Sequence, residues 1–193
     1  MSVKLFAALS AALLAGGAVM TDRKSGSRAT AAEREFPPEG QFVEVDGRQV
    51  HAVVAGDGPD VVLIHGAGGN TREFTFEFID RLTDRYRVIV FDRPGLGYTE
   101  RPDAVETGAW ATDGESPAVQ ATMLREASRQ IGIKNPIIAG HSFGSIIALG
   151  WAVLDLDGAD DLNAAGIMSM GGVMMPWPGD LGRYYTMNGS KFG

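Results

Sequence analysis

The hydrophobic and polar positions of this chain change their period several times along the sequence. Residues 42–45 and 48–54 alternate on either side of an Asp-Gly pair, which is typical of a two-residue hairpin turn. Residues 61–64 and 87–91 contain continuous apolar runs instead, and such runs are typical of strands covered on both faces. The pattern therefore predicts a β-hairpin followed by strands buried within a sheet.

Apolar residues at helical spacing predict two helices. The first, over residues 70–82, would have Asn70 as its N-cap and Glu73 at the third position, a pair typical of a capping box. Its apolar stripe would consist of Phe74, Phe78 and Leu82. The second helix would cover residues 116–132, because a Ser-Pro pair is typical of a helix start and glycine of a helix end.

A glycine-rich turn joins another apolar strand to an apolar helix. Residues 136–139 are apolar, Gly140-His141-Ser142-Phe143-Gly144 follows, and helical spacing continues to about residue 156. This order is the Gly-x-Ser-x-Gly pattern of a nucleophile elbow, in which a serine lies at a sharp turn between strand and helix. The glycines let strand and helix approach closely, and the helix N-terminus offers free N–H groups to an oxyanion. The pattern makes Ser142 a candidate nucleophile.

Strands and helices that alternate in this way predict an α/β fold with a mostly parallel sheet and helices on both faces. A last strand is predicted over residues 165–173. In such sheets the loops at the carboxyl ends of the strands carry the chemistry. Three loops follow predicted strands, at residues 65–70, 92–98 and 140–144. We expect these loops to converge on one site.

An apolar segment at residues 5–20 precedes the folded part of the chain. It is shorter than the about 20 residues of a typical spanning helix. Positive charges follow it, at Arg23, Lys24, Arg28 and Arg34, and such charges keep the next segment cytoplasmic. The sequence therefore favours a transmembrane anchor in residues 1–20 over the cleaved signal peptide of a secreted or periplasmic protein, with a buried helix as third interpretation. Residues 21–40 are interpreted as a linker.

Composition and charge narrow the classes of partner and cofactor. A net charge of −7 provides no basic surface for nucleic acid. The absence of cysteine excludes disulfides, thiolate metal sites and cysteine nucleophiles. The three histidines, His51, His65 and His141, are scattered and lack the spacing of metal ligands. We therefore expect no nucleic acid partner, no metal and no other cofactor.

Three motifs in this order resemble the N-terminal part of a serine-type α/β-hydrolase. They are His65-Gly66 after one buried strand, Asp92-Arg93-Pro94-Gly95-Leu96-Gly97 after the next, and the elbow around Ser142. Together they are far more specific than any one of them. The resemblance implies an α/β-hydrolase fold that is incomplete at its C-terminus, with a partial core at residues 41–175 and the start of a lid at residues 176–193. The anchor-like start is similar to that of a bacterial subset of the family.

The resemblance also implies roles for individual residues. Ser142 would be the nucleophile, and the backbone N–H groups of Ala67 and Phe143 would form the oxyanion hole. The remaining candidates are expected to have structural or supporting roles: His65 orders its loop, Asp92 holds its own turn, and His51 and His141 are not catalytic. His51, on the early hairpin, is expected to be distant from the site.

The chain departs from the family after Ser142. Family members place an acid and then a histidine after the nucleophile, and no histidine follows Ser142 in this sequence. A serine without a base stays protonated and is a poor nucleophile. The sequence is therefore interpreted as a fragment of an esterase- or lipase-like hydrolase for small-molecule ester or related acyl substrates, inactive in this form. The alternative is a non-catalytic α/β-hydrolase-like binding or scaffold protein.

Overall fold

The structure is a computed structural model that describes residues 30–101, 116–158 and 162–172, together with separate positions nearer the N-terminus: residues 16, 17, 19, 20, 23, 24 and 26–28. The chain divides into two units. The first comprises residues 1–38, 107–112 and 181–193, and the second comprises residues 39–106 and 113–180. The strands and helices named below all belong to the second unit.

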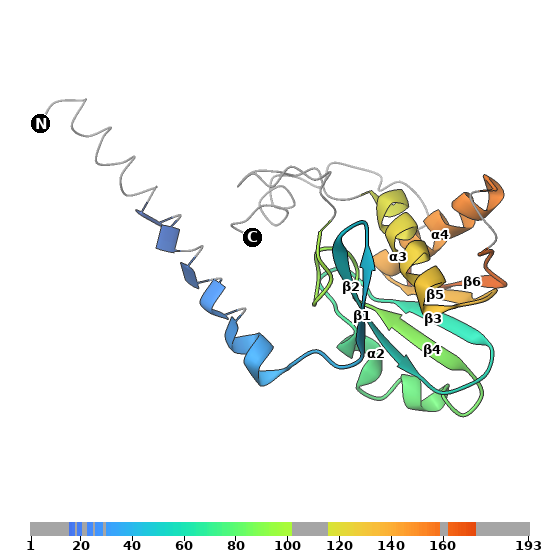
Figure 1. Ribbon diagram of the computed structural model, residues 1–193, viewed down its shortest axis with the longest axis horizontal. Coiled ribbons are helices and arrows are strands. Elements are labelled where there is room, and N and C mark those ends of the chain that lie inside the picture. Colours follow the sequence, from blue (N-terminus) through green and yellow to red (C-terminus); the bar gives the residue numbers. More distant parts are fainter. Residues whose placement is uncertain are drawn as a thin grey trace, which may run out of the picture. The chain divides into compact units, whose positions relative to one another are not determined.

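The second unit is built on a six-stranded sheet with the order β1-β2-β4-β3-β5-β6 (Figure 1). Its strands are β1 (Gln41–Val45), β2 (Arg48–Ala55), β3 (Asp60–Ile64), β4 (Arg87–Phe91), β5 (Ile137–His141) and β6 (Gly166–Met170). β1 pairs antiparallel with β2, and β2 antiparallel with β4. The pairs β3–β4, β3–β5 and β5–β6 are parallel. The predicted hairpin and the predicted mostly parallel sheet are confirmed.

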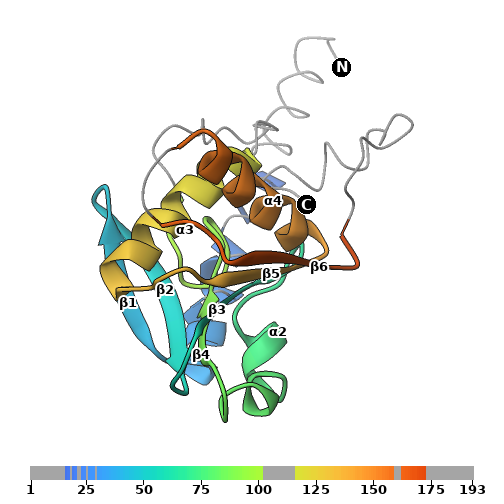
Figure 2. The same ribbon diagram turned by 90° about the vertical axis from the view of Figure 1, so that its right-hand side faces the viewer.

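Helices cover both faces of this sheet, as Figure 2 shows. On one face lie the two long helices, α3 (Pro117–Ile131) and α4 (Phe143–Leu156). On the other face lie the short helix α2 (Arg72–Thr75) and the 3₁₀ helix η1 (Ile79–Arg81). This arrangement is the one that the alternation of strands and helices predicted.

Successive residues of β3 pack into two separate cores. Val62 belongs to the same buried cluster as Leu124 of α3, whereas Leu63 belongs to the cluster that contains Phe74 of α2. All five residues of β3 are buried. Since full burial of an aliphatic side chain contributes about 1.5–3 kcal/mol, a strand covered on both sides gains from an apolar residue at every position. This explains the continuous apolar runs of the sequence.

The helix predicted over residues 116–132 is confirmed. Ser116 Oγ accepts a hydrogen bond from the Val119 N–H at 3.2 Å, and Pro117 occupies the first turn. Gly132 ends the helix with a φ of 76°, a left-handed conformation that glycine adopts without a Cβ clash. The sequence signals at both ends of α3 therefore have their usual physical basis.

The helix predicted over residues 70–82 is shorter and differently capped. α2 covers only Arg72–Thr75, and a turn then leads into η1. Its N-cap is Thr71, without a side-chain cap, and Asn70 Oδ1 instead accepts the Arg72 N–H at 2.9 Å. The apolar periodicity of this segment reflects the burial of two short turns against the sheet, and one continuous helix was the wrong prediction.

The last predicted strand and the predicted lid lie at or beyond the end of the described residues. β6 covers Gly166–Met170, inside the predicted strand over residues 165–173. Residues 102–115 and 173–193, which include the predicted start of a lid at residues 176–193, lie outside the described residues.

The predicted transmembrane anchor and membrane localisation are wrong. In the part of the chain that the structure describes, no helix is long and apolar enough to cross a membrane. The described helical positions 16, 17, 19 and 20 are followed by helical positions with exposed Arg23, Lys24 and Arg28, and charged side chains are costly inside a bilayer. Residues 5–15 and 18 of the predicted anchor lie outside the described residues.

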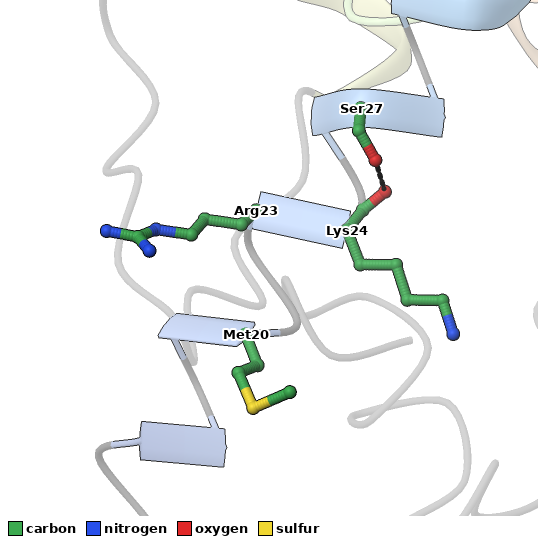
Figure 3. A pocket seen from close by; sticks show the side chains of 4 residues that line it. All are labelled: Met20, Arg23, Lys24 and Ser27. Carbon is green, nitrogen blue, oxygen red and sulfur yellow. Dashed lines mark hydrogen bonds between the residues drawn. The ribbon is translucent and has the colours of Figure 1, made fainter.

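A hollow on the first unit is lined by Met20, Arg23, Lys24 and Ser27 (Figure 3). All four residues are exposed. Ser27 Oγ donates a hydrogen bond to the Lys24 carbonyl at 3.0 Å, and the side chains of Arg23 and Lys24 point away from each other in Figure 3. The Ser27 hydroxyl is therefore bonded to the backbone and not to the Lys24 side chain.

Candidate active site

Ser142 lies at the turn between β5 and α4, with a φ of 50° and a ψ of −116°. Residues other than glycine seldom adopt a positive φ, because the Cβ then crowds the backbone. The neighbouring glycines make the turn possible, since a Cβ on Gly140 would collide with the backbone of Gly144, and one on Gly144 with that of Ile64. The Ser142 N–H donates to the Met170 carbonyl of β6 at 2.9 Å. The turn thus holds a half-buried serine at the carboxyl end of β5.

The three predicted loops meet around this serine. The loop after β3 lies against the elbow, since a Cβ on Gly66 would be 3.2 Å from the Cβ of Ser142. The same loop contacts the loop after β4, because the Arg93 N–H donates to His65 Nε2 at 2.9 Å. The predicted convergence is confirmed.

His65 has both ring nitrogens engaged with the backbone. Its Nδ1 donates to the Gly66 carbonyl at 3.0 Å, while Nε2 accepts the Arg93 N–H. Because Nε2 must be unprotonated to accept, the ring is the neutral Nδ1–H tautomer. Burial lowers the pKa of His65 and so favours the same neutral form. His65 orders its loop, as the sequence predicted, and has no free nitrogen for a proton from Ser142.

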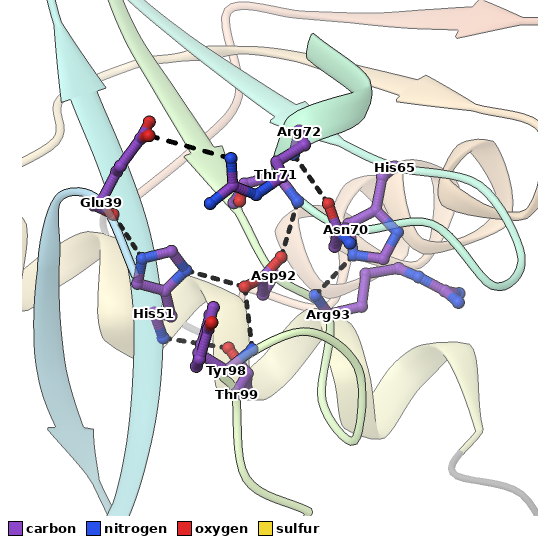
Figure 4. Close-up of polar contacts among 10 residues, drawn as sticks. All are labelled: Glu39, His51, His65, Asn70, Thr71, Arg72, Asp92, Arg93, Tyr98 and Thr99. Carbon is purple, nitrogen blue, oxygen red and sulfur yellow. Dashed lines mark hydrogen bonds and ion pairs between the residues drawn. The ribbon is translucent and has the colours of Figure 1, made fainter. Parts of the chain in front are cut away.

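Asp92 ties several segments together (Figure 4). Its Oδ2 accepts hydrogen bonds from His51 Nδ1 at 2.7 Å and from the Tyr98 N–H at 2.9 Å, and its Oδ1 accepts the Thr71 N–H at 2.6 Å. Burial by itself raises the pKa of Asp92, but the bonds from His51, Tyr98 and Thr71 outweigh it and hold the pKa below its ordinary value. Asp92 holds its own turn, as predicted, and also fixes the loop after β3.

His51 lies beside Asp92 of the loop after β4, and its expected distance from Ser142 stays a prediction. Its Nδ1 faces the Asp92 carboxylate at 2.7 Å, and its Nε2 faces the Glu39 carbonyl at 2.5 Å. Both ring nitrogens thus face oxygen atoms of other segments. The predicted structural role of His51 is confirmed, because this ring joins β2 to the loop after β4 and is buried.

A second pair of a histidine and a carboxylate lies at the surface next to Ser142. His141 Nδ1 donates to Glu73 Oε1 at 2.5 Å, and the two side chains are 49% and 27% exposed. Glu73 belongs to α2, and its Oε2 also accepts the Gly66 N–H at 3.2 Å. The sequence pattern predicted a helix cap at Glu73 and indicated neither contact. The glycines of the loop after β3, which allow a close approach, are the only signal that could have indicated them.

Ala67 and Phe143 occupy the positions that the resemblance assigns to the oxyanion hole. Ala67 is exposed in the loop after β3, and Phe143 is the first residue of α4. The first N–H groups of a helix have no acceptor within it. The guanidinium of Arg93 lies 4.7 Å from the centre of the Phe143 ring, a cation–π contact that helps to fix the start of α4. The roles of Ser142, Ala67 and Phe143 in catalysis stay predictions.

The described part of the chain contains no hydrogen bond between a histidine ring and the Ser142 hydroxyl. Among the later acids, Asp155 forms an ion pair with Arg125 of α3 and accepts the Ala164 N–H at 2.8 Å. These contacts join α3, α4 and the segment before β6, which is a structural role. Residues 159–161, which contain two further aspartates, lie outside the described residues.

A mostly parallel sheet with a serine at a strand-to-helix turn defines the class of the α/β-hydrolases. The sequence model described as "Alpha/beta hydrolase family" matches residues 61–189. The match covers more than half of the sequence, and the chain belongs to this family. The resemblance stated from the motifs is confirmed.

Similar proteins of this fold differ in their named activities. The chain is 34% identical over 100 residues to a probable 1-acylglycerol-3-phosphate O-acyltransferase of Oryza sativa subsp. japonica, covering 49% of this chain and 22% of that protein. It is 30% identical over 141 residues to a cis-3-alkyl-4-alkyloxetan-2-one decarboxylase of Xanthomonas campestris pv. campestris, covering 68% and 44%. An esterase structure from Exiguobacterium antarcticum matches with a TM-score of 0.56 and 25% identity, covering 70% and 46%. The chain thus spans less than half the length of each.

Proposed function

We propose that this chain carries the nucleophile of a serine hydrolase that acts on small-molecule esters or related acyl compounds. The observation that carries the proposal is the backbone of Ser142, which holds a positive φ at the apex of a strand-to-helix turn. Proteins keep a costly backbone conformation of this kind chiefly where function requires it. The esterase among the similar structures is consistent with this class of substrate.

In the proposed reaction, Ser142 Oγ attacks the carbonyl carbon of the substrate and its proton passes to a base. The carbonyl oxygen becomes an oxyanion, which accepts hydrogen bonds from the N–H groups of Ala67 and Phe143. The bond from the carbonyl carbon to the leaving alcohol then breaks, and the alcohol takes up the proton. Water attacks the resulting acyl-enzyme in the same way and releases the acid.

The base of this reaction is the part that the described residues do not supply. His51 and His65 have both ring nitrogens engaged, and the hydrogen bond of the His141 ring goes to Glu73 and not to the Ser142 hydroxyl. We propose that the base is supplied by an acid and a histidine that follow the nucleophile in the order of the family. A non-catalytic binding protein is the second candidate, since no histidine ring of the described residues forms a hydrogen bond to the Ser142 hydroxyl.

A fluorophosphonate probe tests the proposal, because it labels a serine that has both a base and an oxyanion hole. We expect at most trace labelling and no p-nitrophenyl ester turnover in the 193-residue chain. A longer protein with an acid and a histidine after residue 193 should be labelled rapidly. Ser142→Ala should abolish this labelling, whereas Ser169→Ala, which removes a hydroxyl from β6, should leave it unchanged.

Each outcome separates the candidates. Equal labelling of the parent and the Ser142→Ala variant would refute the nucleophile. Rapid, stoichiometric labelling of Ser142 in the 193-residue chain would refute the need for an outside base. A folded longer protein that is never labelled would support the binding protein.

A further inference from the structure

Glu73 connects two loops that belong to different strands. It reaches the elbow through His141 Nδ1, at 2.5 Å from its Oε1. It reaches the loop after β3 through the Gly66 N–H, at 3.2 Å from Oε2 and 3.4 Å from Oε1. The carboxylate is thus the one group, among the contacts of the described residues, that bonds to both loops.

The loop after β3 is shaped around this carboxylate. A Cβ on Gly69 would lie 2.5 Å from Glu73 Oε2 and 3.1 Å from His65 Nδ1, so the chain has no room for a side chain there. The Gly69 N–H donates to the Gly66 carbonyl at 3.3 Å, which closes the loop into a tight turn. The carboxylate therefore lies inside the turn and does not cap α2.

Gly66 lies next to the elbow, so its contact with Glu73 bears on the geometry of the proposed site. A Cβ on Gly66 would lie 3.2 Å from Ser142 Cβ and 3.3 Å from His141 Nδ1. The residue after Gly66 is Ala67, whose N–H is assigned to the oxyanion hole in the proposed function. The Gly66 N–H lies in the peptide plane directly before the plane of the Ala67 N–H, so a group that binds it holds the residue from which the next donor projects. Hydrogen bonds to an ionised acceptor are about twice as strong as neutral ones.

We propose that Glu73 is a positioning residue that, with His141 as its partner, holds the loop after β3 in place against the elbow. This inference rests on the proposed role of Ser142. A bare carboxylate close to a forming oxyanion would oppose it electrostatically. The hydrogen bond from His141 Nδ1 offsets this charge, and it also ties Glu73 to the residue before the nucleophile. This explains why a polar ring stands at a position of the elbow that the serine chemistry itself does not require.

The first experiment uses the 193-residue chain and needs no catalytic base. Hydrogen exchange of backbone amides should be at least about tenfold faster in residues 65–70 of Glu73→Ala than in the parent, because the Gly66 N–H loses its acceptor. Glu73→Gln should give a smaller change, since glutamine keeps one acceptor oxygen and replaces the other with an NH₂ donor. Glu77→Ala is the matched control, because it removes an exposed charge one turn further on and should leave exchange unchanged.

The amides of β4 report whether each variant is still folded. If β4 keeps its protection and residues 65–70 exchange as in the parent, the inference is wrong. If Glu73→Ala also loses protection in β4, that variant is unfolded and the isosteric Glu73→Gln is used instead. Exchange in residues 65–70 of Glu73→Gln that equals that of the parent, with β4 still protected, would then refute the inference.

The second experiment measures labelling by the fluorophosphonate probe in the longer protein. Misplacement of a donor by a fraction of an ångström to 1 Å can cost up to about 100-fold, so we expect Glu73→Ala to lower the labelling rate by about 10- to 100-fold. Its effect on ester turnover should appear in kcat more than in KM. A parent-like rate in Glu73→Ala, with Ser142→Ala unlabelled, would overturn the positioning role and leave the proposed function intact. If Ser142→Ala is labelled like the parent, the proposed function fails, and the exchange experiment alone decides whether Glu73 holds the loop.

Discussion

Two pairs of a histidine and a carboxylate lie at the same edge of the sheet, and they differ mainly in burial. In the His51–Asp92 pair the side chains are 2% and 0% exposed, whereas in the His141–Glu73 pair they are 49% and 27% exposed. The hydrogen-bond distances are similar, at 2.7 and 2.5 Å. Geometry alone therefore does not distinguish the two pairs.

Burial changes what each pair contributes. A buried charge that loses its partner is left without water, and breaking such a pair costs about 3–5 kcal/mol. An exposed pair is screened, and its contribution is about 0–1 kcal/mol. The His51–Asp92 pair is thus suited to hold the loops of the site together. The His141–Glu73 pair can be altered without unfolding the chain, which suits a group that adjusts the position of one loop.

The largest expected effect follows from breaking the buried pair. Asp92→Asn removes the carboxylate that accepts from His51, Tyr98 and Thr71, and we expect it to lower the free energy of unfolding by about 3–5 kcal/mol. Denaturant unfolding at neutral pH measures the change. Asp84→Asn, an exposed position before β4, is the control and should stay within about 0.5 kcal/mol. A loss below about 1 kcal/mol in Asp92→Asn would show that burial does not separate the pairs.

The sequence was sufficient for the features that depend on local signals. The alternation around Asp46-Gly47, the cap at Ser116 and the glycines around Ser142 each report a backbone requirement within a few residues. Each of these signals led to an element that the structure contains. The alternation of strands and helices then predicted which loops share the carboxyl edge of the sheet.

The sequence was not sufficient for contacts between distant segments. His51 and Asp92 are 41 residues apart, and Glu73 and His141 are 68 apart. Taken alone, each residue of the two pairs fits an ordinary local role, such as a position in a strand, in a turn or at a helix cap. Glu73 was misassigned because an acid three residues after Asn70 fits a capping box, whereas the short α2 directs its carboxylate toward Gly66. Only the packing of α2 beneath the sheet decides between these roles.

A medium effect is expected from His65, which is buried and neutral. Since burial lowers the pKa of His65 in the folded chain, the unfolded chain binds a proton at a higher pH than the folded one. Stability should therefore fall as the pH decreases below about 6.5, by up to about 1.4 kcal/mol per pH unit, until the lower folded pKa is reached. Unfolding measured between about pH 7.5 and about pH 5 checks this slope.

His65→Gln is the control for this slope, because glutamine can still donate and accept one hydrogen bond each but does not titrate. The difference in stability between the parent and His65→Gln should decrease as the pH falls. A constant difference would mean that His65 titrates alike in both states. Titration of Asp92 does not contribute to this slope. Its pKa in the folded chain is lowered, so its contribution to the free energy of unfolding is lost only below its unfolded pKa of about 4.

The smallest expected effect concerns the exposed pair, and its dependence on salt sharpens the comparison. His141→Ala should lower the free energy of unfolding by less than about 1 kcal/mol, because its side chain is half exposed. This small loss should shrink further when sodium chloride rises from about 0.1 M to about 1 M, since the screening length falls from about 10 Å to about 3 Å. The loss in Asp92→Asn should persist at the higher salt concentration, because buried pairs are screened much less.

A loss above about 2 kcal/mol in His141→Ala, unchanged by salt, would mean that the exposed pair stabilises the fold in the same way as the buried pair. Its proximity to Ser142 would then reflect the stability of the fold and not the position of a loop.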